Sequence, residues 1–397
     1  MIGPRTLEDL GWPTLVDHWA KRCATRRGEA AVRGPVLLAA IDEARARAVE
    51  ISEARGLASR GLSLPLGGIA EISGAIDRVV KSAALEAAEL VAVASTGRAL
   101  ARLRTHLREH AAGGRLAAYA ERLADLGHVF HPILDAFGAD GRLVDHASDA
   151  LGGLRRAAAS LKATLENRMD SLLGDERFSA YLQDAYYTQR EDRYVLPIRT
   201  DGKGFVRGIV HGTSQSGQTL FIEPEEIVDL NNRLKLAEAE VVAEEHRIFI
   251  KFSGWIAEEA DGFLASLAAA ETLDLIAAAA IMADDTVAAE PILEDAPRIA
   301  LLHARHPLML LAERRCVAND VTVAASQTLL ISGPNAGGKT VALKTVGLAA
   351  VMARAGLHLT AESGSAIGWF HDIVTDIGDA QNLDKDLSTF SGHVVNL

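Results

Sequence analysis

The sequence predicts a multidomain, mainly α-helical protein with a small β-insert in mid-chain and an α/β nucleotide-binding segment near its end. Three observations predict this architecture. Of the 397 residues, 49% are apolar but only 5% are aromatic, and an alanine-rich composition with few aromatic residues favours helices. Short β-type runs separated by glycine turns lie between residues 193 and 223. A glycine-rich loop with the spacing of a phosphate-binding motif occupies residues 333–340.

The first predicted domain, residues 1–192, consists of helices joined by short turns. Helical character extends from residue 7 to about residue 126, and the clearest interruption is the glycine- and proline-containing segment 61–68. A turn at residues 138–141 precedes a further helix, predicted over 148–173. Arginines between residues 98 and 122 have spacings that scatter them around a helix, which favours a solvated face over a nucleic-acid-binding stripe.

The second predicted domain, residues 193–290, begins with three short strands at 193–199, 205–211 and 218–223. We expect hairpin turns at 201–204 and 214–217, because neither glycine cluster has the order of a dinucleotide-binding loop. Acidic helical periodicity follows over residues 224–283 and predicts long arms, with an antiparallel pair as one arrangement. Pro291 and Pro297 mark the linker into the third domain, residues 291–397.

Charge and cysteine usage limit the possible functions. The net charge of −12 provides no global basic footprint, so any contact with nucleic acid has to come from a local patch. The two cysteines, Cys23 and Cys316, have no metal-ligand spacing and are expected to be reduced thiols. The N-terminus lacks the pattern of a signal peptide, and the most apolar stretch, 275–283, is too short to span a bilayer. These features predict a cytoplasmic protein that does not contact a membrane.

The glycine-rich loop predicts a site for ATP or ADP with Mg²⁺. In such a motif the backbone N–H groups surround the phosphates, the lysine reaches the β- and γ-phosphates, and the hydroxyl binds Mg²⁺. A buried strand at 328–331 and a helix over 340–355, ending at Gly356, are predicted on either side. We therefore expect Thr340 to bind Mg²⁺ and the loop to bind nucleotide; its residues are Gly333, Pro334, Asn335, Ala336, Gly337, Gly338, Lys339 and Thr340.

The residues around this loop resemble the MutS-type branch of the ABC ATPases. Its bacterial endonuclease MutS-two subfamily is the closer match, and the similarity extends over essentially the whole chain. The segments that carry it are 208–224, 230–232, 304–308, 333–348, 376–381 and 387–393, with a weaker match at 64–68. The resemblance implies a helical core and lever region with a small β-hairpin insert and long helical clamp arms, followed by an incomplete α/β P-loop ATPase domain of the ABC type.

The same resemblance implies the activity and further site residues. Family members bind and hydrolyse ATP as head-to-tail homodimers, in which the signature segment of one subunit reaches the γ-phosphate held by the other. Carried over to this sequence, Ser388 is the signature residue that acts in trans and Gln381 belongs to the glutamine loop. Val317 and Asn319 lie where the family approaches the adenine. The subfamily is associated with branched DNA, suppression of recombination and the splitting of stalled ribosomes, so DNA, rRNA or the ribosome are the implied partners.

Several elements of the family pattern are missing from the sequence. The family places an apolar run ending in Asp-Glu after the signature, where the carboxylates support Mg²⁺ and position the attacking water. Neither this Walker B run nor the Smr nuclease domain occurs before residue 397. We therefore expect the chain to bind nucleotide weakly and to cleave nothing by itself. It is either a fragment of a longer protein, which would be the ATPase and endonuclease, or a naturally truncated product.

Two further motifs have simple structural interpretations. Phe221-Ile222-Glu223 has the order of the wedge that mismatch readers insert into DNA, but its position in a predicted strand favours packing on a core. His303 and His306 lack the partners of a metal site.

The leading hypothesis is an ATP-dependent clamp on branched DNA or stalled ribosomes. The alternative is a non-catalytic scaffold that binds DNA or rRNA while nucleotide only fixes the orientation of its domains.

Overall fold

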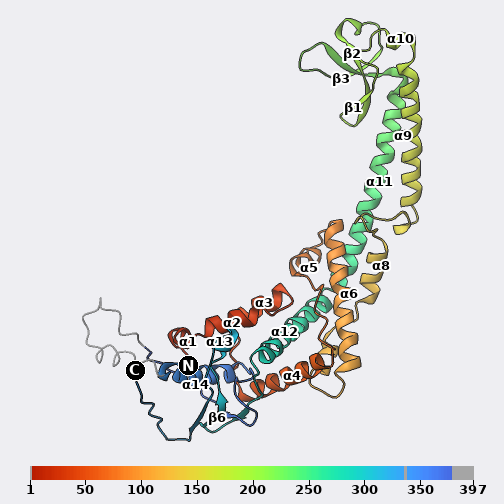
Figure 1. Cartoon of the computed structure of the whole chain (residues 1–397). Coiled ribbons are helices and arrows are strands. Elements are labelled where there is room, and N and C mark those ends of the chain that lie inside the picture. Colours follow the sequence, from red (N-terminus) through yellow and green to blue (C-terminus); the bar gives the residue numbers. More distant parts are fainter. Residues whose placement is uncertain (1, 335–337, 378–397) are drawn as a thin grey trace. The chain divides into compact units, whose positions relative to one another are not determined.

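The computed structural model describes residues 2–334 and 338–377. The chain forms two compact units: unit 1 comprises residues 1–74, 95–130 and 259–397, and unit 2 comprises residues 75–94 and 131–258. Figure 1 follows the elements along the chain. The division falls within three helices, α5 (Ser73–Val80), α6 (Ala87–His110) and α8 (Gly127–Asp135). The domain borders predicted after residues 192 and 290 remain a prediction.

Unit 1 is built around one almost wholly apolar helix, α12 (Ala260–Asp285). Its buried residues lie on all sides, which suits a helix surrounded by others. It packs against four helices that come from the first third of the chain, α2 (Trp12–Ala20), α3 (Arg26–Arg33), α4 (Ile41–Ser59) and α7 (Ala117–Arg122). Trp19 is fully buried in this core, and its indole N–H donates to the Leu275 carbonyl (3.0 Å).

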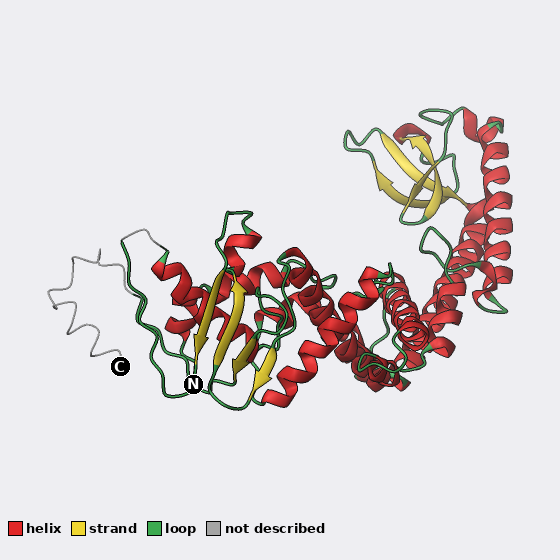
Figure 2. Ribbon diagram, turned by 60° about the horizontal axis from the view of Figure 1, so that its bottom comes forward, coloured by secondary structure: helices red, strands yellow, loops and turns green. Residues whose placement is uncertain are grey.

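A four-stranded sheet stands beside these helices in unit 1 (Figure 2). The strand order is β5-β8-β6-β7, with β5 and β8 parallel and the other pairs antiparallel. The strands are β5 (Ile292–Glu294), β6 (Ile299–Ala304), β7 (Asn319–Val323) and β8 (Ala366–Gly368). The helices of this part of the chain are α13 (Pro307–Leu311) and α14 (Lys339–Arg354), and α14 packs on β8 and α4.

Unit 2 combines two long helices with a second small sheet. Helices α9 (Leu151–Leu173) and α11 (Glu225–Glu258) run side by side, and the sheet lies at one end of the pair in Figure 1. Leu165, Leu196 and Leu234 belong to one buried cluster that joins the helices to the sheet. The remaining elements are η1 (Asp145–Ala147), α10 (Glu176–Ser179), β1 (Thr188–Arg190), β2 (Arg193–Arg199), η2 (Thr200–Gly202), β3 (Gly208–Thr213) and β4 (Thr219–Pro224).

The sheet of unit 2 confirms the three predicted strands and corrects one of the two predicted hairpins. The strand order is β1-β2-β4-β3, so β2 pairs with β4 rather than with β3. The turn at residues 214–217 is a hairpin between β3 and β4, but residues 201–204 carry the chain past β4 to the far edge. The prediction of a hairpin at 201–204 was wrong because pairing of β2 with β4 buries both strands on their two faces.

The long helices predicted over residues 224–283 do not pair with each other as an antiparallel pair. Helix α11 packs along α9, which precedes the sheet in sequence, whereas α12 belongs to the core of unit 1. Helix α11 also packs on β3 and β4, and its side chains Leu236, Val242 and Ile250 remain exposed. Among the described helices, α12 alone is long and apolar enough by composition to cross a membrane, and 61% of its most apolar window is buried inside the protein.

The strand predicted before the phosphate loop is absent in the structure. Residues 324–334 form an exposed coil, and the Leu330 side chain is 88% exposed. The prediction was wrong because a strand needs a neighbour that pairs with its N–H and C=O groups. No strand of the described part of the chain pairs with residues 328–331.

Candidate nucleotide-binding site

The candidate site lies where the coil ends and α14 begins. Gly338 precedes the helix with a φ of 86°, a left-handed conformation that favours glycine. No described side chain caps this helix end, so the N–H groups of its first turn are free to bind an anion. The predicted helix at 340–355 is confirmed within one residue at each end.

Lys339 is the first residue of α14 and folds back over the loop. Its Nζ donates to the carbonyl oxygens of Gly333 (2.6 Å) and Pro334 (2.7 Å). Gly333 has a φ of 152°, which favours glycine there and lets the backbone turn towards the lysine. The ammonium group is therefore held at the mouth of the loop by backbone oxygens, where the oxygens of a phosphate would be equivalent partners.

The helix that presents the loop is fixed by the first residues of the chain. Helix α1 (Pro4–Leu10) packs on α14, and a Cβ added to Gly347 would lie 2.5 Å from Leu10 Cδ2. The same segment contacts the chain beyond α14. Ile2 forms a parallel bridge with Ile373, and the Thr375 hydroxyl donates to the Asp9 carboxylate (2.9 Å). Small residues on α14 therefore permit close packing against the N-terminal helix.

The structure places five of the predicted loop residues and brings three of them together. Lys339 contacts Gly333 and Pro334 directly, Gly338 begins the helix, and the Thr340 side chain is exposed beside it. The predicted residues Asn335, Ala336, Gly337, Gln381 and Ser388 lie outside the described residues. The roles assigned to all of these residues, including the binding of Mg²⁺ by Thr340, stay predictions.

The two predicted adenine contacts lie together at the start of β7. The Asn319 side chain donates to the Val317 carbonyl (3.1 Å), and the Val317 side chain is 72% exposed. The backbone N–H of the nearby His306 donates to Cys316 Sγ (3.3 Å). Burial lowers the pKa of His306, and Lys344 lowers it further. The imidazole is therefore a neutral group packed beside α14.

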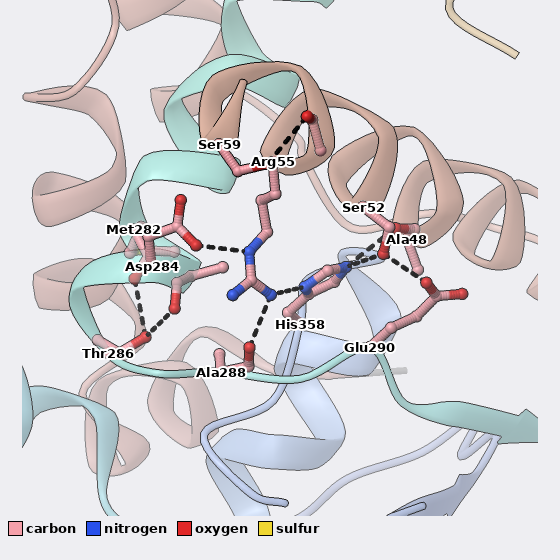
Figure 3. A network of polar contacts seen from close by, with 12 residues as sticks. Ala48, Ser52, Arg55, Ser59, Met282, Asp284, Thr286, Ala288, Glu290 and His358 are labelled. Carbon is pink, nitrogen blue, oxygen red and sulfur yellow. Dashed lines mark hydrogen bonds and ion pairs between the residues drawn. The ribbon is translucent and has the colours of Figure 1, made fainter. Parts of the chain in front are cut away.

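Sequence reasoning missed a polar network around the buried His358, which Figure 3 shows. Arg55 donates to His358 Nδ1 (3.0 Å), to the Ala288 carbonyl (2.8 Å) and to Asp284 (2.7 Å). Since Nδ1 accepts from a guanidinium, Nε2 carries the imidazole hydrogen and donates to the Ala48 carbonyl (3.0 Å). Burial lowers the pKa of His358 from its ordinary value. The network joins α4, the end of α12 and the segment after α14.

Comparison with known proteins identifies the family to which this architecture belongs. Residues 329–397 match the family described as MutS domain V. Over 99% of its length the chain is 37% identical to the endonuclease MutS2 of Symbiobacterium thermophilum. It is 36% identical to the protein of the same name in an Anaeromyxobacter species over 98% of its length. The chain belongs to the MutS family. The match to the putative endonuclease MutS2 of Bacillus subtilis is 36% identical over 90% of this MutS-family chain.

The chain spans about half the length of the curated relatives it matches. Its alignments cover 49% of the Symbiobacterium protein, 50% of the Anaeromyxobacter protein and 46% of the Bacillus protein. The identification of the MutS-type family, and of its MutS2 branch, from the sequence is confirmed by these matches. The activity, substrates and partners of the whole protein are proposals for this chain.

Proposed function

We propose that this MutS-family chain is the nucleotide-binding and nucleic-acid-gripping part of an ATP-dependent clamp. The observation that carries the proposal is the geometry at the start of α14. A left-handed glycine opens an uncapped helix, and the Lys339 ammonium group lies over the preceding loop. Free N–H groups and a lysine at one helix end are the donors that the phosphates of ATP or ADP require. Thr340 would then bind the accompanying Mg²⁺.

The target of the clamp is branched or structured DNA, stalled ribosomes, or both. The relatives are named as endonucleases, and we take nucleic acid as the target that this name implies. The paired helices α9 and α11, with the small sheet at their end, supply the clamp arm in this proposal. We expect a homodimer in the cytoplasm, in which Ser388 of one subunit approaches the nucleotide of the other. Nuclease activity is expected only in the full-length protein.

A non-catalytic scaffold is the second candidate function. It is favoured by the exposed coil of residues 324–334, because a phosphate loop is positioned for hydrolysis when a strand and a helix fix both of its ends. In this role the chain binds DNA or rRNA, and nucleotide only sets the orientation of the domains. Addition of the residues that follow in a longer protein, with ATP turnover as the measurement, separates a fragment of an ATPase from a scaffold.

The experiment that tests nucleotide binding compares two lysines on the same helix. A fluorescent ATP analogue is titrated into the parent chain and into the Lys339→Ala and Lys344→Ala variants. We expect the Lys339→Ala substitution to weaken binding at least about tenfold, because charge-assisted contacts to the phosphates are lost. The Lys344→Ala substitution, five residues further along α14, should leave the affinity within about twofold. Equal affinity of the parent and the Lys339→Ala variant would contradict the proposal.

A further inference from the structure

The small sheet of unit 2 carries an open pocket that the nucleotide site does not use. The pocket has a volume of about 880 Å³ and lies between the end of β1 and the hairpin turn that joins β3 to β4. Its wall includes Arg190, His211, Phe221 and the turn residues 214–216. We call it the β3 pocket.

A fully buried carboxylate fixes the back of the β3 pocket. Glu223 on β4 has no exposed surface and accepts three hydrogen bonds, from Arg193 Nη1 (2.8 Å), His211 Nε2 (2.6 Å) and Asn231 Nδ2 (2.9 Å). A buried carboxylate is costly unless such donors surround it. Because Glu223 accepts from Nε2, this nitrogen carries a hydrogen, and the orientation of the imidazole ring is fixed. His211 Nδ1 lies 3.9 Å from Oε2 of Glu191, which is also part of the pocket wall.

Arg190 supplies a cation without a partner at the rim. Within the described part of the chain its guanidinium forms no ion pair, and it lies 4.3 Å from the centre of the Phe221 ring. Stacking on an aromatic ring holds a guanidinium in place, while its N–H groups point outward in the plane of the guanidinium and remain free. The guanidinium is therefore positioned to bind an anion with two parallel hydrogen bonds.

The hairpin turn adds hydroxyl and backbone donors. Ser214 Oγ accepts from the Thr219 N–H (3.1 Å) and lies 3.3 Å from Ser216 Oγ, so its own hydrogen is available to Ser216 or to a ligand. In the described structure the backbone N–H groups of Gln215 and Ser216 donate to no protein acceptor. Two free N–H groups beside two hydroxyls form a concave donor surface of the kind that binds phosphate oxygens.

We propose that the β3 pocket binds a phosphodiester group of a nucleic-acid strand. The donors are those that phosphate oxygens accept from, namely a guanidinium, hydroxyls and backbone N–H groups. The one arginine at the rim matches the single charge of a diester, whereas the exposed carboxylate of Glu191 would repel the double charge of a monoester more strongly. A pocket larger than one phosphate leaves space for the sugars on either side. This inference rests on the proposed function, because it assigns the clamp arm its contact with nucleic acid.

The test measures the binding of a fluorescein-labelled oligonucleotide, as a single strand and as part of a four-way junction, to the whole chain. We expect Arg190→Ala to weaken binding about tenfold and to reduce the slope of log affinity against log salt by about one. The matched control is Arg199→Ala on β2, whose arginine is exposed, is paired with Asp201 and lies outside the pocket. It should change the affinity by less than about twofold.

A second variant keeps the test decisive if Arg190→Ala does not fold. Ser216 is exposed, and within the described residues its side chain hydrogen-bonds only to Ser214, so Ser216→Glu should leave the melting temperature unchanged. The new carboxylate should weaken oligonucleotide binding at least about tenfold by repulsion. Unchanged affinity in both variants, with the parent chain still binding the oligonucleotide, overturns the β3 pocket and leaves the clamp proposal standing.

Two further measurements distinguish a phosphodiester from a free phosphate monoester, and the β3 pocket from the clamp proposal as a whole. Inorganic phosphate and AMP are added as competitors at the nucleotide concentration of the labelled strand. Competition as strong as that of an unlabelled oligonucleotide overturns the assignment to a phosphodiester in favour of a free monoester. A parent chain that binds neither oligonucleotide overturns the nucleic-acid part of the clamp proposal together with this inference, even when Lys339-dependent ATP binding is observed.

Discussion

The candidate phosphate loop of unit 1 is a run of eight consecutive residues, whereas the residues that line the β3 pocket of unit 2 come from β1, β3, β4 and the turn before β4. The described loop residues Gly333, Pro334 and Gly338 are exposed, and Lys339 donates to neighbouring carbonyl oxygens. The β3 pocket is backed by Glu223, which has no exposed surface. A site built from residues that are consecutive in sequence can therefore be altered with little effect on stability. A site built from residues that are far apart in sequence depends on the buried groups that hold its strands together.

The largest expected effect concerns this difference in stability. Glu223→Ala leaves Arg193, His211 and Asn231 without their shared acceptor. Breaking a buried charged network by removing one partner typically costs about 3–5 kcal/mol. We therefore expect urea unfolding of the variant to show a loss of about 3 kcal/mol from the free energy of unfolding of unit 2. Trp255 lies in unit 2, and its fluorescence reports this unit in a background where the other tryptophans are replaced by phenylalanine.

Two control variants sharpen the comparison. Glu191→Ala removes a carboxylate of the same pocket that is 81% exposed, and Lys339→Ala removes the lysine of the phosphate loop. Each should change the free energy of unfolding by less than about 0.5 kcal/mol. If Lys339→Ala destabilised the chain as strongly as Glu223→Ala, the contrast between the two regions would be wrong.

A smaller effect is expected from glycines in left-handed conformations. Gly338 has a φ of 86° and Gly217 a φ of 71°. An alanine in such a conformation costs about 1–2 kcal/mol. Gly338→Ala should therefore weaken binding of the ATP analogue about tenfold and leave oligonucleotide binding unchanged. Gly217→Ala should weaken oligonucleotide binding instead, by changing the turn that holds Ser214 and Ser216. If both variants lost affinity for the same ligand, the two regions would not act separately.

The stability of unit 1 is expected to fall in mild acid because His358 is held neutral. Burial lowers the pKa of His358 below its ordinary value of 6.5, and Arg55 acts in the same direction. Above that value the imidazole is neutral in both the folded and the unfolded chain, so its contribution is complete. As pH falls below 6.5 the unfolded chain binds a proton first, and stability is lost.

The measurement is the urea midpoint between pH 7.5 and pH 5.5. His358→Gln should show a smaller loss than the parent chain, since the group that titrates is gone. His303→Gln is the matched control, because this histidine is exposed and lies outside the network of Figure 3. A pH dependence that is the same in the parent and in His358→Gln would exclude His358 as a source of acid sensitivity.

The smallest expected effect is a difference in thiol reactivity. Burial, with the nearby carboxylates of Asp274 and Glu29, raises the pKa of Cys23 to about 12. At pH 8 only about one molecule in ten thousand then carries the thiolate, so modification by a disulfide reagent should be very slow. Cys316 lies in the loop before β7 and should account for the fast phase. A Cys316→Ser variant that retains a fast phase would contradict this assignment.

The sequence was sufficient to predict those elements that local patterns determine. Helix α14 was predicted within one residue at each end, and β2 was predicted at its observed bounds, because glycine, periodicity and β-branching act over a few neighbouring residues. The phosphate loop could be recognised for the same reason. Its residues are consecutive, so their spacing along the chain is also their spacing in the site.

Sequence reasoning failed where distant segments decide the structure. The run at 328–331 has the composition of a strand but no described partner, and the turn at 201–204 looks like a hairpin although β2 pairs with β4. The donors of the β3 pocket could not be found because Arg190 and Ser214 meet only through the strand order of the sheet. Nor could spacing indicate that Arg55 and His358 meet in one buried network.

The packing of α1 against α14 has a consequence for the order in which the chain folds during synthesis. Helix α1 packs on α2, which follows it directly, but residues 2–10 contact residues 347, 373 and 375 only after these have left the ribosome. At about 5–20 residues per second, the face of α1 that packs on α14 stays uncovered for roughly 20–75 s. Leu10, which is 1% exposed in the folded chain, is then a site for a chaperone or for misfolding. Residues 2–10 are thus synthesised long before the segments that hold them against α14.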